Sequence, residues 1–427
     1  MLYSLFEWLN QHGIRFPGDR LLHFITFRVL IAVILSLVIT TVFGRKLIIY
    51  LRKKQIGESV RDLGLAGEQQ KKGTPTMGGI IIILAILIPT LLLADLHKAY
   101  VRLMIFATIW LGIIGFVDDY LKLRAKKIAQ QQGVAYKKGD KDGLAGWFKI
   151  LGQLVLGIAV AGVMLFNDNT KAWREYRGEG VPADTTITKK VLVDGKEKIF
   201  VVTNVPVTTI PFVKGHEFNY SKLLPQNWRD GFTWLLYGVI VILIVIAVSN
   251  GANITDGLDG LATGTSAIIG ACLGVFAYAS GNFRFAEYLN ILYVPNLGEL
   301  TIYIAAFIGA TIGFLWYNSY PAQVFMGDTG SLTLGGIIAA LAIIVRKELL
   351  IPIFCGVFLI ENLSVMIQVS YFKYTKRKYG EGRRVFLMSP LHHHYQKLGY
   401  HESKIAVRFW IVTILCVVFS VVSLKIR

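Results

Sequence analysis

Charged residues and cysteines are both scarce in this chain of 427 residues. Only 17% of the residues are charged whereas 54% are hydrophobic, a balance that excludes an ordinary soluble domain. The three cysteines, Cys272, Cys355 and Cys416, lie in separate apolar runs. This odd, scattered set offers neither a disulfide framework nor the spacing of a metal site, so we interpret the cysteines as packing residues.

Acidic residues are the scarcer of the two charge types. The chain has 27 Asp and Glu against 45 Lys and Arg, a net charge of +18, which favours an anionic partner. Because the basic residues lie between apolar runs rather than in one compact region, we expect membrane lipids or a phosphorylated substrate, and no nucleic acid. The first twenty residues carry no convincing cleavage site, so the first apolar run is predicted to be a retained helix rather than a signal peptide.

Long apolar runs take the place of the missing charge. Runs of about 17 to 22 residues match a hydrocarbon core roughly 30 Å thick, and lipid offers the backbone no hydrogen-bond partners, so these runs are predicted to be helices. About ten transmembrane helices are predicted, over Leu22–Phe43, Gly78–Ala94, Val101–Val117, Trp147–Phe166, Phe232–Ser249, Leu261–Ala279, Thr301–Trp316, Leu332–Val345, Ile351–Tyr371 and Ile405–Leu424. We therefore expect an all-α polytopic membrane protein, with residues 1–427 forming a single catalytic domain in the membrane.

Short loops rich in Lys and Arg predict the orientation of this bundle. The loops after the first, third and ninth runs hold most of these residues, so they are expected in the cytoplasm, with both termini on the periplasmic side. Residues 167–231 then form a periplasmic insertion. Within it, Thr186–Val193 and Lys198–Val202 flank Asp194-Gly195, which predicts a small β-hairpin. The loops that follow odd-numbered runs all fall on the cytoplasmic face, and they hold almost every unusual polar motif.

Adjacent carboxylates end the third run. Asp118 and Asp119 follow an apolar helix, and we expect them at its C-terminus, where the helix dipole disfavours negative charge. Helix capping therefore does not explain why two carboxylates lie here, and we interpret them as functional residues. Two carboxylates suit Mg²⁺, which binds one or two of them together with substrate phosphates, although one could instead act as a base. Lys122 could offset phosphate charge, or it could be an ordinary cytoplasmic lysine.

Two further polar segments precede helices that run outward. The first, Asn250 to Gly260, carries Asn250, Asn253, Asp256 and Asp259, more polar side chains than one helix cap needs. The second contains Phe325 and Asp328. Asp328 could cap its helix, but as a third carboxylate on the same face it is a good metal-ligand candidate. Phe325 could stack on a base or serve as an interfacial aromatic.

Two more motifs are expected on this face. His392, His393 and His394 are consecutive, so they cannot all face one point, and zinc binding lacks a partnering Cys or Glu spacing. Hydrogen bonds to phosphate oxygens are the favoured function. The segment from Lys72 to Gly79, with Thr76, could line a phosphate or sugar pocket or simply begin a helix.

Together these motifs resemble the phospho-N-acetylmuramoyl-pentapeptide transferases, a branch of the polyprenyl-phosphate N-acetylhexosamine-1-phosphate transferase family. The resemblance rests on Thr74-Pro-Thr-Met-Gly-Gly79, Phe116-Val-Asp-Asp119, Asn253-Ile-Thr-Asp-Gly-Leu-Asp259, Phe325-Met-Gly-Asp328 and Pro390-Leu-His-His-His-Tyr395, in that order. The triple histidine is similar to the muramoyl-pentapeptide branch rather than to the branch that uses UDP-N-acetylglucosamine. The insertion at 167–231 is longer than in compact members.

The resemblance implies ten membrane helices, a cytoplasmic active site in the bacterial inner membrane, and a homodimer. It implies transfer of phospho-MurNAc-pentapeptide from UDP-MurNAc-pentapeptide to undecaprenyl phosphate, which gives lipid I and UMP with Mg²⁺ as cofactor. It places the metal on Asp328 and catalysis on Asp118, Asp119, Asp328 and His393. The substrate-binding residues that it implies are Lys72, Thr76, Lys122, Asn250, Asn253, Asp256, Asp259, Phe325, Gln368, His392 and His394.

Two alternatives stay open at this point. The lipid phosphate could attack directly after losing its proton to Asp118 or Asp119, or one aspartate could form a covalent aspartyl-phosphate first. From a different class, an ion-coupled transporter would use membrane acids as a relay. Such acids usually lie near the bilayer midplane, whereas here they cluster at one face, with Arg28 and Glu361 the main charges inside the predicted spans.

Overall fold

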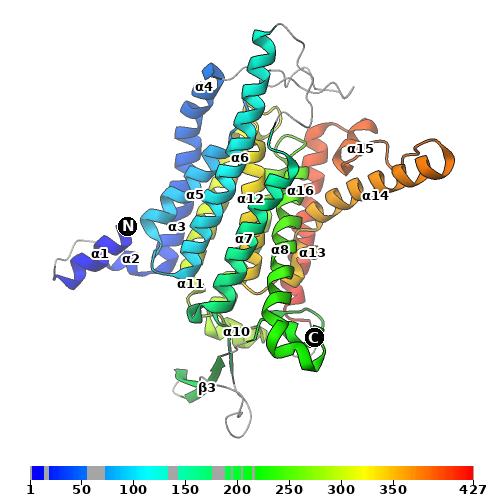
Figure 1. Cartoon of the computed structure of the whole chain (residues 1–427). Coiled ribbons are helices and arrows are strands. Elements are labelled where there is room, and N and C mark those ends of the chain that lie inside the picture. Colours follow the sequence, from blue (N-terminus) through cyan, green and yellow to red (C-terminus); the bar gives the residue numbers. More distant parts are fainter. Residues whose placement is uncertain are drawn as a thin grey trace.

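The computed structural model describes residues 2–13, 19–54, 73–132, 143–175, 188–193, 196–202, 205–213 and 217–426. Long helices run side by side through this part of the chain and form one bundle, with short β strands at one end of it (Figure 1). Lys72 is among the predicted site residues and lies outside the described residues.

Each predicted membrane span coincides with a helix or with consecutive helices. In chain order these are α3 (Ile25–Val38) with η1 (Ile39–Phe43) and α4 (Gly44–Lys54), α5 (Gly79–Leu93), α6 (Ala99–Gln131), α7 (Gly146–Phe166), α8 (Arg229–Thr255), α9 (Leu261–Gly281), α11 (Leu297–Asn318), α12 (Gly327–Ile344), α13 (Ile351–Phe354) with α14 (Gly356–Tyr379), and α16 (Glu402–Ser423). The shorter helices are α1 (Leu2–Gln11), α2 (Asp19–His23), α10 (Phe283–Leu289) and α15 (Leu391–Lys397), and the 3₁₀ turns are η3 (Asp168–Thr170), η4 (Tyr220–Leu223), η5 (Gln226–Trp228) and η6 (Glu348–Leu350).

The predicted all-α, multi-pass membrane fold is confirmed. By length and apolar composition, eight helices of the described chain could cross a membrane, or nine if η6–α13 and α14, which meet at a bend of 78°, form one span. Helix α5 is apolar but has only 15 residues. The count of ten spans therefore stays a prediction.

One helix end was predicted wrongly, and the error matters for the site. The apolar run stops at Val117, but α6 continues to Gln131, so Asp118 and Asp119 lie within the helix rather than at its C-terminus. A run of apolar residues marks where lipid contact ends, whereas the helix continues because its polar residues remain good helix formers. The argument from the negative end of the helix dipole therefore does not apply to this pair.

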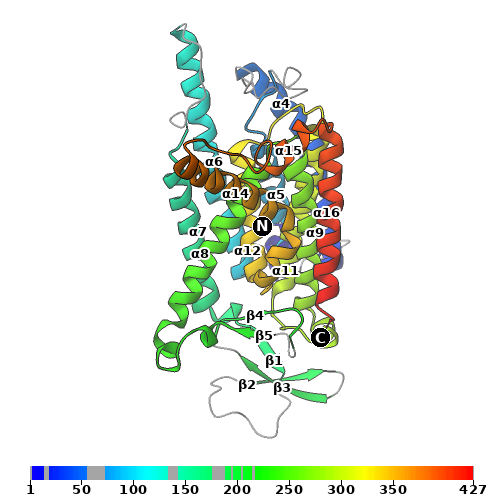
Figure 2. The same cartoon turned by 90° about the vertical axis from the view of Figure 1, so that its right-hand side faces the viewer.

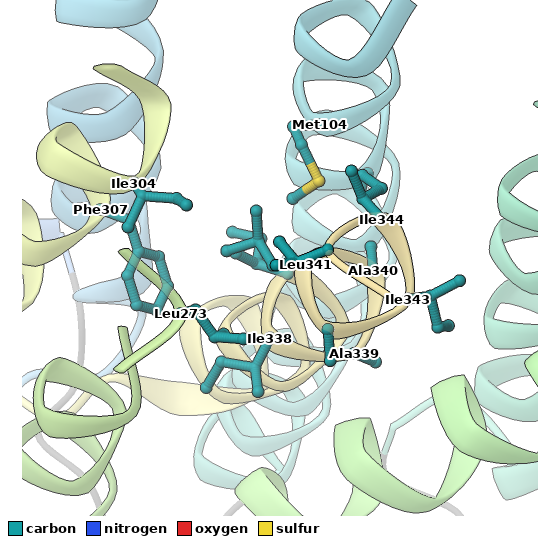
Figure 3. Packing of buried hydrophobic residues seen from close by; sticks show 14 of the residues in the cluster. Met104, Leu273, Ile304, Phe307, Ile338, Ala339, Ala340, Leu341, Ile343 and Ile344 are labelled. Carbon is teal, nitrogen blue, oxygen red and sulfur yellow. The ribbon is translucent and has the colours of Figure 1, made fainter. Parts of the chain in front are cut away.

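Helix α12 is the centre of the bundle. Its apolar window is 89% buried, against 28% for α8 and α16, so it contacts protein on nearly all sides. Figure 3 shows Leu341 and Ile338 of α12 among side chains from α6, α9 and α11. The glycines that make its sequence look like a weak span allow this packing, because a Cβ at Gly335 would lie 2.6 Å from the Cα of Ser249 on α8.

Two small antiparallel sheets lie at the end of the bundle opposite α4 and α15 (Figure 2). The predicted hairpin is confirmed by β2 (Thr188–Val193) and β3 (Lys196–Val202), which pair from Val193 with Lys196 onward. The sheets also contain β1 (Trp173–Glu175), β4 (Val207–Thr209) and β5 (Glu217–Asn219). The first and last described residues lie toward this end of the bundle: Tyr3 of α1 stacks under Arg28 near the start of α3, and Lys425, after α16, donates to the backbone of Tyr288.

Polar contacts attach the region of β4 to the connection between α12 and η6. The fully buried Lys347 Nζ donates to Thr209 Oγ1 at 2.7 Å, and the Tyr220 hydroxyl donates to Glu348 at 2.9 Å. Burial lowers the pKa of Lys347 to about 7, against the opposing effect of Glu348. Residues of the predicted insertion thus pack against the membrane bundle through a buried polar network.

Candidate active site

Three carboxylates from two helices meet at the end of the bundle opposite the β strands. Asp118 and Asp119 lie on α6, and Asp328 lies in the first turn of α12. One oxygen from each lies within 4.8 Å of the others. Both aspartates of α6 are buried and the Asp328 side chain is only 15% exposed, so all three acidic groups have lost most of their water, which is costly without compensating partners.

Close backbone packing brings these helices together. A Cβ at Gly115, one turn before Asp118, would lie 2.3 Å from the carbonyl oxygen of Asp328. A Cβ at Gly79, at the start of α5, would lie 2.2 Å from the amide nitrogen of Gly330. Only glycine permits these distances. The carboxylate cluster therefore depends on two glycine contacts that the sequence pattern did not reveal.

Asp119 caps the N-terminus of α12 from the neighbouring helix. Its carboxylate accepts the amide N–H of Asp328 at 3.1 Å, the amide N–H of Thr329 at 2.9 Å and the Thr329 hydroxyl at 2.6 Å. The first turn of a helix has free N–H groups and a partial positive charge, which an anion stabilises. Both oxygens of Asp119 are thus used to fix the position of Asp328.

Two lysines compensate the other two carboxylates. Lys122 Nζ lies 2.6 Å from Asp118 Oδ2 and 2.8 Å from Asp328 Oδ2, and Lys149 Nζ contacts the same two oxygens. Asp118 also accepts the backbone N–H of Leu144 at 2.7 Å. The result is an alternating cluster of two carboxylates and two ammonium groups, with Asp119 beside it.

Lys149 is the site residue that sequence reasoning missed. It lies in the first turn of α7, inside the predicted span Trp147–Phe166, and only 20% of its side chain is exposed. The sequence does contain a signal for Lys149, because a lone lysine within an apolar run is costly to bury and indicates a specific partner. The other charges noted inside the spans are bound in local pairs: Arg28 forms a two-pronged bridge with Glu299, and Glu361 accepts from His392.

Helix α8 contributes one direct contact to the cluster. Asn253 Nδ2 donates to Asp328 Oδ1 at 2.9 Å and to Ser331 Oγ at 3.0 Å. Asn250, one turn earlier, instead donates to Gln153 Oε1 and to the backbone of Ile246, so it braces α7 against α8. Two of the predicted asparagines are therefore helical, although only one reaches the carboxylates.

The two predicted aspartates after α8 lie in the loop that leads to α9. Asp256 follows the last residue of α8 and is half-buried. Asp259 is buried, and its Oδ2 accepts the backbone N–H of Ala322 at 3.0 Å, which ties this loop to the segment before α12. Neither caps α9, whose N-cap is Gly260 without a side-chain bond.

The segment containing Thr76 pairs with the segment containing Phe325. Phe325 donates its N–H to Pro75 at 2.8 Å and accepts from the N–H of Gly78 at 2.9 Å. Thr76 Oγ1 and Asp119 Oδ2 both lie within about 3 Å of where a Cβ on Gly327 would be. Gly327 adopts a positive φ of 71°, which glycine tolerates, and this turn directs the chain into α12.

The three histidines point in different directions, as their spacing predicts. His392 is fully buried, and its Nδ1 lies 3.1 Å from Glu361 Oε2, while its other ring nitrogen packs against Gly257. His393 contacts Gln396 at 2.6 Å, and His394 Nδ1 accepts the N–H of Leu387 at 3.2 Å. His392 therefore joins α15, which carries the three histidines, to the loop after α8.

Gln368 organises a neighbouring loop. Its Oε1 accepts the backbone N–H groups of Val385 and Phe386, both at 3.0 Å. The side chain amide is thus already engaged with the protein, and its described contacts are those of a residue that shapes a pocket wall.

The donor set suits a hard divalent cation. Carboxylate oxygens are the preferred protein ligands of such ions, and Asp118 and Asp328 present theirs to a common point. Lys122 and Lys149 hold the same two oxygens, so positive charge already compensates them there. The chemistry available at this point is stabilisation of phosphate charge by a cation and two lysines beside a carboxylate base.

Comparisons with known proteins agree with this geometry. The model of glycosyl transferase family 4 matches residues 191–346, and signature 1 of phospho-N-acetylmuramoyl-pentapeptide-transferase matches residues 71–83. Curated proteins of the latter name are 54% identical in Flavobacterium psychrophilum, 53% in Flavobacterium johnsoniae and 53% in Parabacteroides distasonis, each over 100% of both chains. The chain belongs to the phospho-N-acetylmuramoyl-pentapeptide-transferase family.

Proposed function

We propose that this protein transfers phospho-MurNAc-pentapeptide from UDP-MurNAc-pentapeptide to undecaprenyl phosphate, forming lipid I and UMP. The observation that carries the proposal is the meeting of Asp118, Asp119 and Asp328 with Lys122 and Lys149 at one end of a membrane bundle. Such a cluster suits phosphoryl transfer, in which the protein supplies position and charge compensation more than covalent chemistry. The product would feed peptidoglycan biosynthesis, and so cell wall biogenesis, cell shape and cell division.

In this proposal Asp118 is the base. Both oxygens of Asp119 are engaged by the start of α12, whereas Asp118 faces the lysines that would draw in phosphate groups. Asp118 takes the proton of the undecaprenyl phosphate, whose oxygen attacks the sugar-linked phosphorus of the nucleotide. The bond from that phosphorus to the bridging oxygen breaks, and UMP leaves. Mg²⁺, held by Asp328 and the substrate phosphates, would supply charge neutralisation.

The remaining predicted residues surround this centre in the proposal. Thr76, Phe325, Asn253 and Asp256 would line the nucleotide site, with Asn250 and Asp259 fixing its walls. His393 would contact the departing or transferred phosphate, and Gln368, His392 and His394 would shape the side that receives the sugar and peptide. Lys122 and Lys149 would compensate the phosphates.

The proposed location is the bacterial inner membrane, with the active site in the cytoplasm and the residues of 167–231 in the periplasm. The support is the distribution of Lys and Arg among the loops, which follows the positive-inside rule. The first and last described residues lie toward the end with the β strands, which agrees with an even number of spans between them. A homodimer is part of the proposal as an inference from the family.

The direct test is release of UMP by the purified protein with UDP-MurNAc-pentapeptide, polyprenyl phosphate and Mg²⁺. We expect UMP to form and to depend on both the lipid and the metal. A folded protein that releases no UMP would overturn the proposal, and release from UDP-N-acetylglucosamine instead would indicate the sister branch. A phosphorylated enzyme trapped with nucleotide in the absence of lipid would replace the direct attack by a covalent aspartyl-phosphate route.

A further inference from the structure

A cavity of about 570 Å³ lies between α14, the loop that follows it, and α15. We call it the basic cavity and define it by Gln368, Phe372, Lys373, Arg384, Leu387 and Lys397. Its volume is within the range of small-ligand sites. The cavity adjoins α15. His392 of α15 packs on the loop after α8, and α8 supplies Asn253 to the carboxylate cluster.

Three cationic residues line this cavity, and each comes from a different segment. Lys373 belongs to α14, Arg384 to the loop and Lys397 to the end of α15. Among the described residues, the cavity walls contain no aspartate or glutamate. Basic residues on the cytoplasmic face of a membrane protein are usually spread over the surface, whereas here three of them from separate segments surround one cavity. This arrangement is typical of a site for an anion.

The loop that carries Arg384 is held in place by side chains. Gln368 accepts the N–H groups of Val385 and Phe386, and the Thr375 hydroxyl accepts the N–H of Arg383 at 2.9 Å. His394 accepts the N–H of Leu387. Binding an anion here would therefore cost little ordering of the backbone, since the protein's own hydrogen bonds have already fixed it.

Apolar surface completes the cavity and narrows the class of ligand. Phe372 and Leu387 line it together with the cations, and both are exposed in the described structure. A ligand that suits these walls has an aliphatic part and at least one negative charge. A free phosphate would use only the cations, whereas a short peptide ending in a carboxylate would use both kinds of wall.

We propose that the basic cavity binds the carboxylate end of the peptide on the sugar substrate, an inference that rests on the proposed function. A muramoyl group is an acyl group, so it joins the amino end of the peptide and leaves a free carboxylate at the other end. The undecaprenyl carrier has one phosphate, and that phosphate must reach Asp118 to react. An anion bound away from the carboxylate cluster therefore comes from the peptide.

The test combines substitutions in the cavity with a change in the substrate. The variants are Lys373→Gln, Arg384→Gln and the double variant of the full-length enzyme, with Lys378→Gln as a matched control. Lys378 is on the same helix, but its amine lies over the rings of Tyr374 and Tyr379 rather than in the cavity. The substrates are UDP-MurNAc-pentapeptide and the same compound with a carboxamide at the peptide end.

We expect each single variant to raise KM for the nucleotide substrate roughly 3- to 10-fold, and the double variant more than about tenfold, with kcat little changed. The carboxamide substrate should raise KM for the unmodified enzyme but add little to the double variant, because both changes remove the same contact. Lys378→Gln should behave as the unmodified enzyme.

The outcomes separate this inference from the function on which it rests. An unmodified enzyme that releases no UMP would contradict the proposed function itself. An active enzyme whose double variant keeps its KM for UDP-MurNAc-pentapeptide would overturn the basic cavity alone. A double variant that raises KM for polyprenyl phosphate instead would also overturn it, and would assign the cations to the lipid phosphate.

Discussion

Replacing Asp119 should weaken the fold, because this carboxylate holds the start of α12. It accepts three hydrogen bonds, from the N–H groups of Asp328 and Thr329 and from the Thr329 hydroxyl. In Asp119→Asn the side-chain nitrogen is a donor, so at least one buried group at the start of α12 loses its acceptor. We expect that loss to cost about 1–3 kcal/mol, with a further 0.3–2 kcal/mol, roughly, from the missing charge at the helix N-terminus.

One effect works in the opposite direction. The change also relieves repulsion between Asp119 and Asp328, so we expect the net free energy of unfolding to fall by about 1–3 kcal/mol. Thr329→Val removes one of the three hydrogen bonds and should give a smaller loss. Activity should fall in Asp119→Asn as well, since Asp328 loses its support.

Asp118→Asn is the matched comparison on the same helix. Its Oδ1 can still accept the N–H of Leu144, and removal of the charge relieves repulsion with Asp328. Lys122 and Lys149 lose their ion pairs with Asp118, but both keep Asp328 Oδ2 as a partner. We therefore expect lost UMP release with a Tm close to that of the unmodified protein. Thermal unfolding of all variants in one detergent provides the measurement. Equal Tm values for Asp119→Asn and the unmodified protein, or equal losses for the two asparagine variants, would refute the assignment of Asp119 as the cap.

Three further predictions concern other parts of the molecule. Lys149→Met should reduce UMP release roughly 10- to 100-fold in a folded protein, because Asp328 loses one of its two lysines; unchanged kcat/KM would contradict this. Gly115→Ala should lower both Tm and activity, since its Cβ would clash with the backbone of Asp328, whereas Gly162→Ala, which meets nothing within 4 Å, should do neither. Burial lowers the pKa of Lys347 to about 7, so between about pH 7 and 10 the unfolded chain binds more protons than the folded protein, and Tm should rise with pH. This rise should be smaller in Lys347→Met, and an identical rise in the two proteins would refute the reasoning.

The positions of the spans could be predicted because lipid imposes a simple rule on the chain. An apolar run long enough to cross the hydrocarbon core has one viable conformation, and every predicted run is helical. The same rule fails at helix ends. Helix α6 continues to Gln131 and α14 continues to Tyr379, because solvent stops the apolar pattern without stopping the helix. In α6, the polar site is built just beyond the apolar run, where the helix continues.

The candidate site could be predicted in its residue types and its common face, but not in its contacts. Asp118, Asp119 and Asp328 are brought together as expected, yet Asp119 serves α12 rather than the open side of the cluster. No property of adjacent aspartates distinguishes them in sequence. The difference arises from the rotation of α6 against α12, which the contact at Gly115 determines.

The close contact of α6 with α12 also links the stability of the core to the chemistry. Helix α12 is the most buried of the candidate spans, and its first turn carries Asp328 and receives Asp119. The position of Asp328 therefore follows from packing along the whole of α12, since a rigid helix transmits a shift at one end to the other. Small residues such as Gly335, about two turns after Asp328 on α12, thereby help to position the carboxylates. Substitutions there should change activity and stability together, whereas substitutions in the basic cavity should change substrate affinity alone.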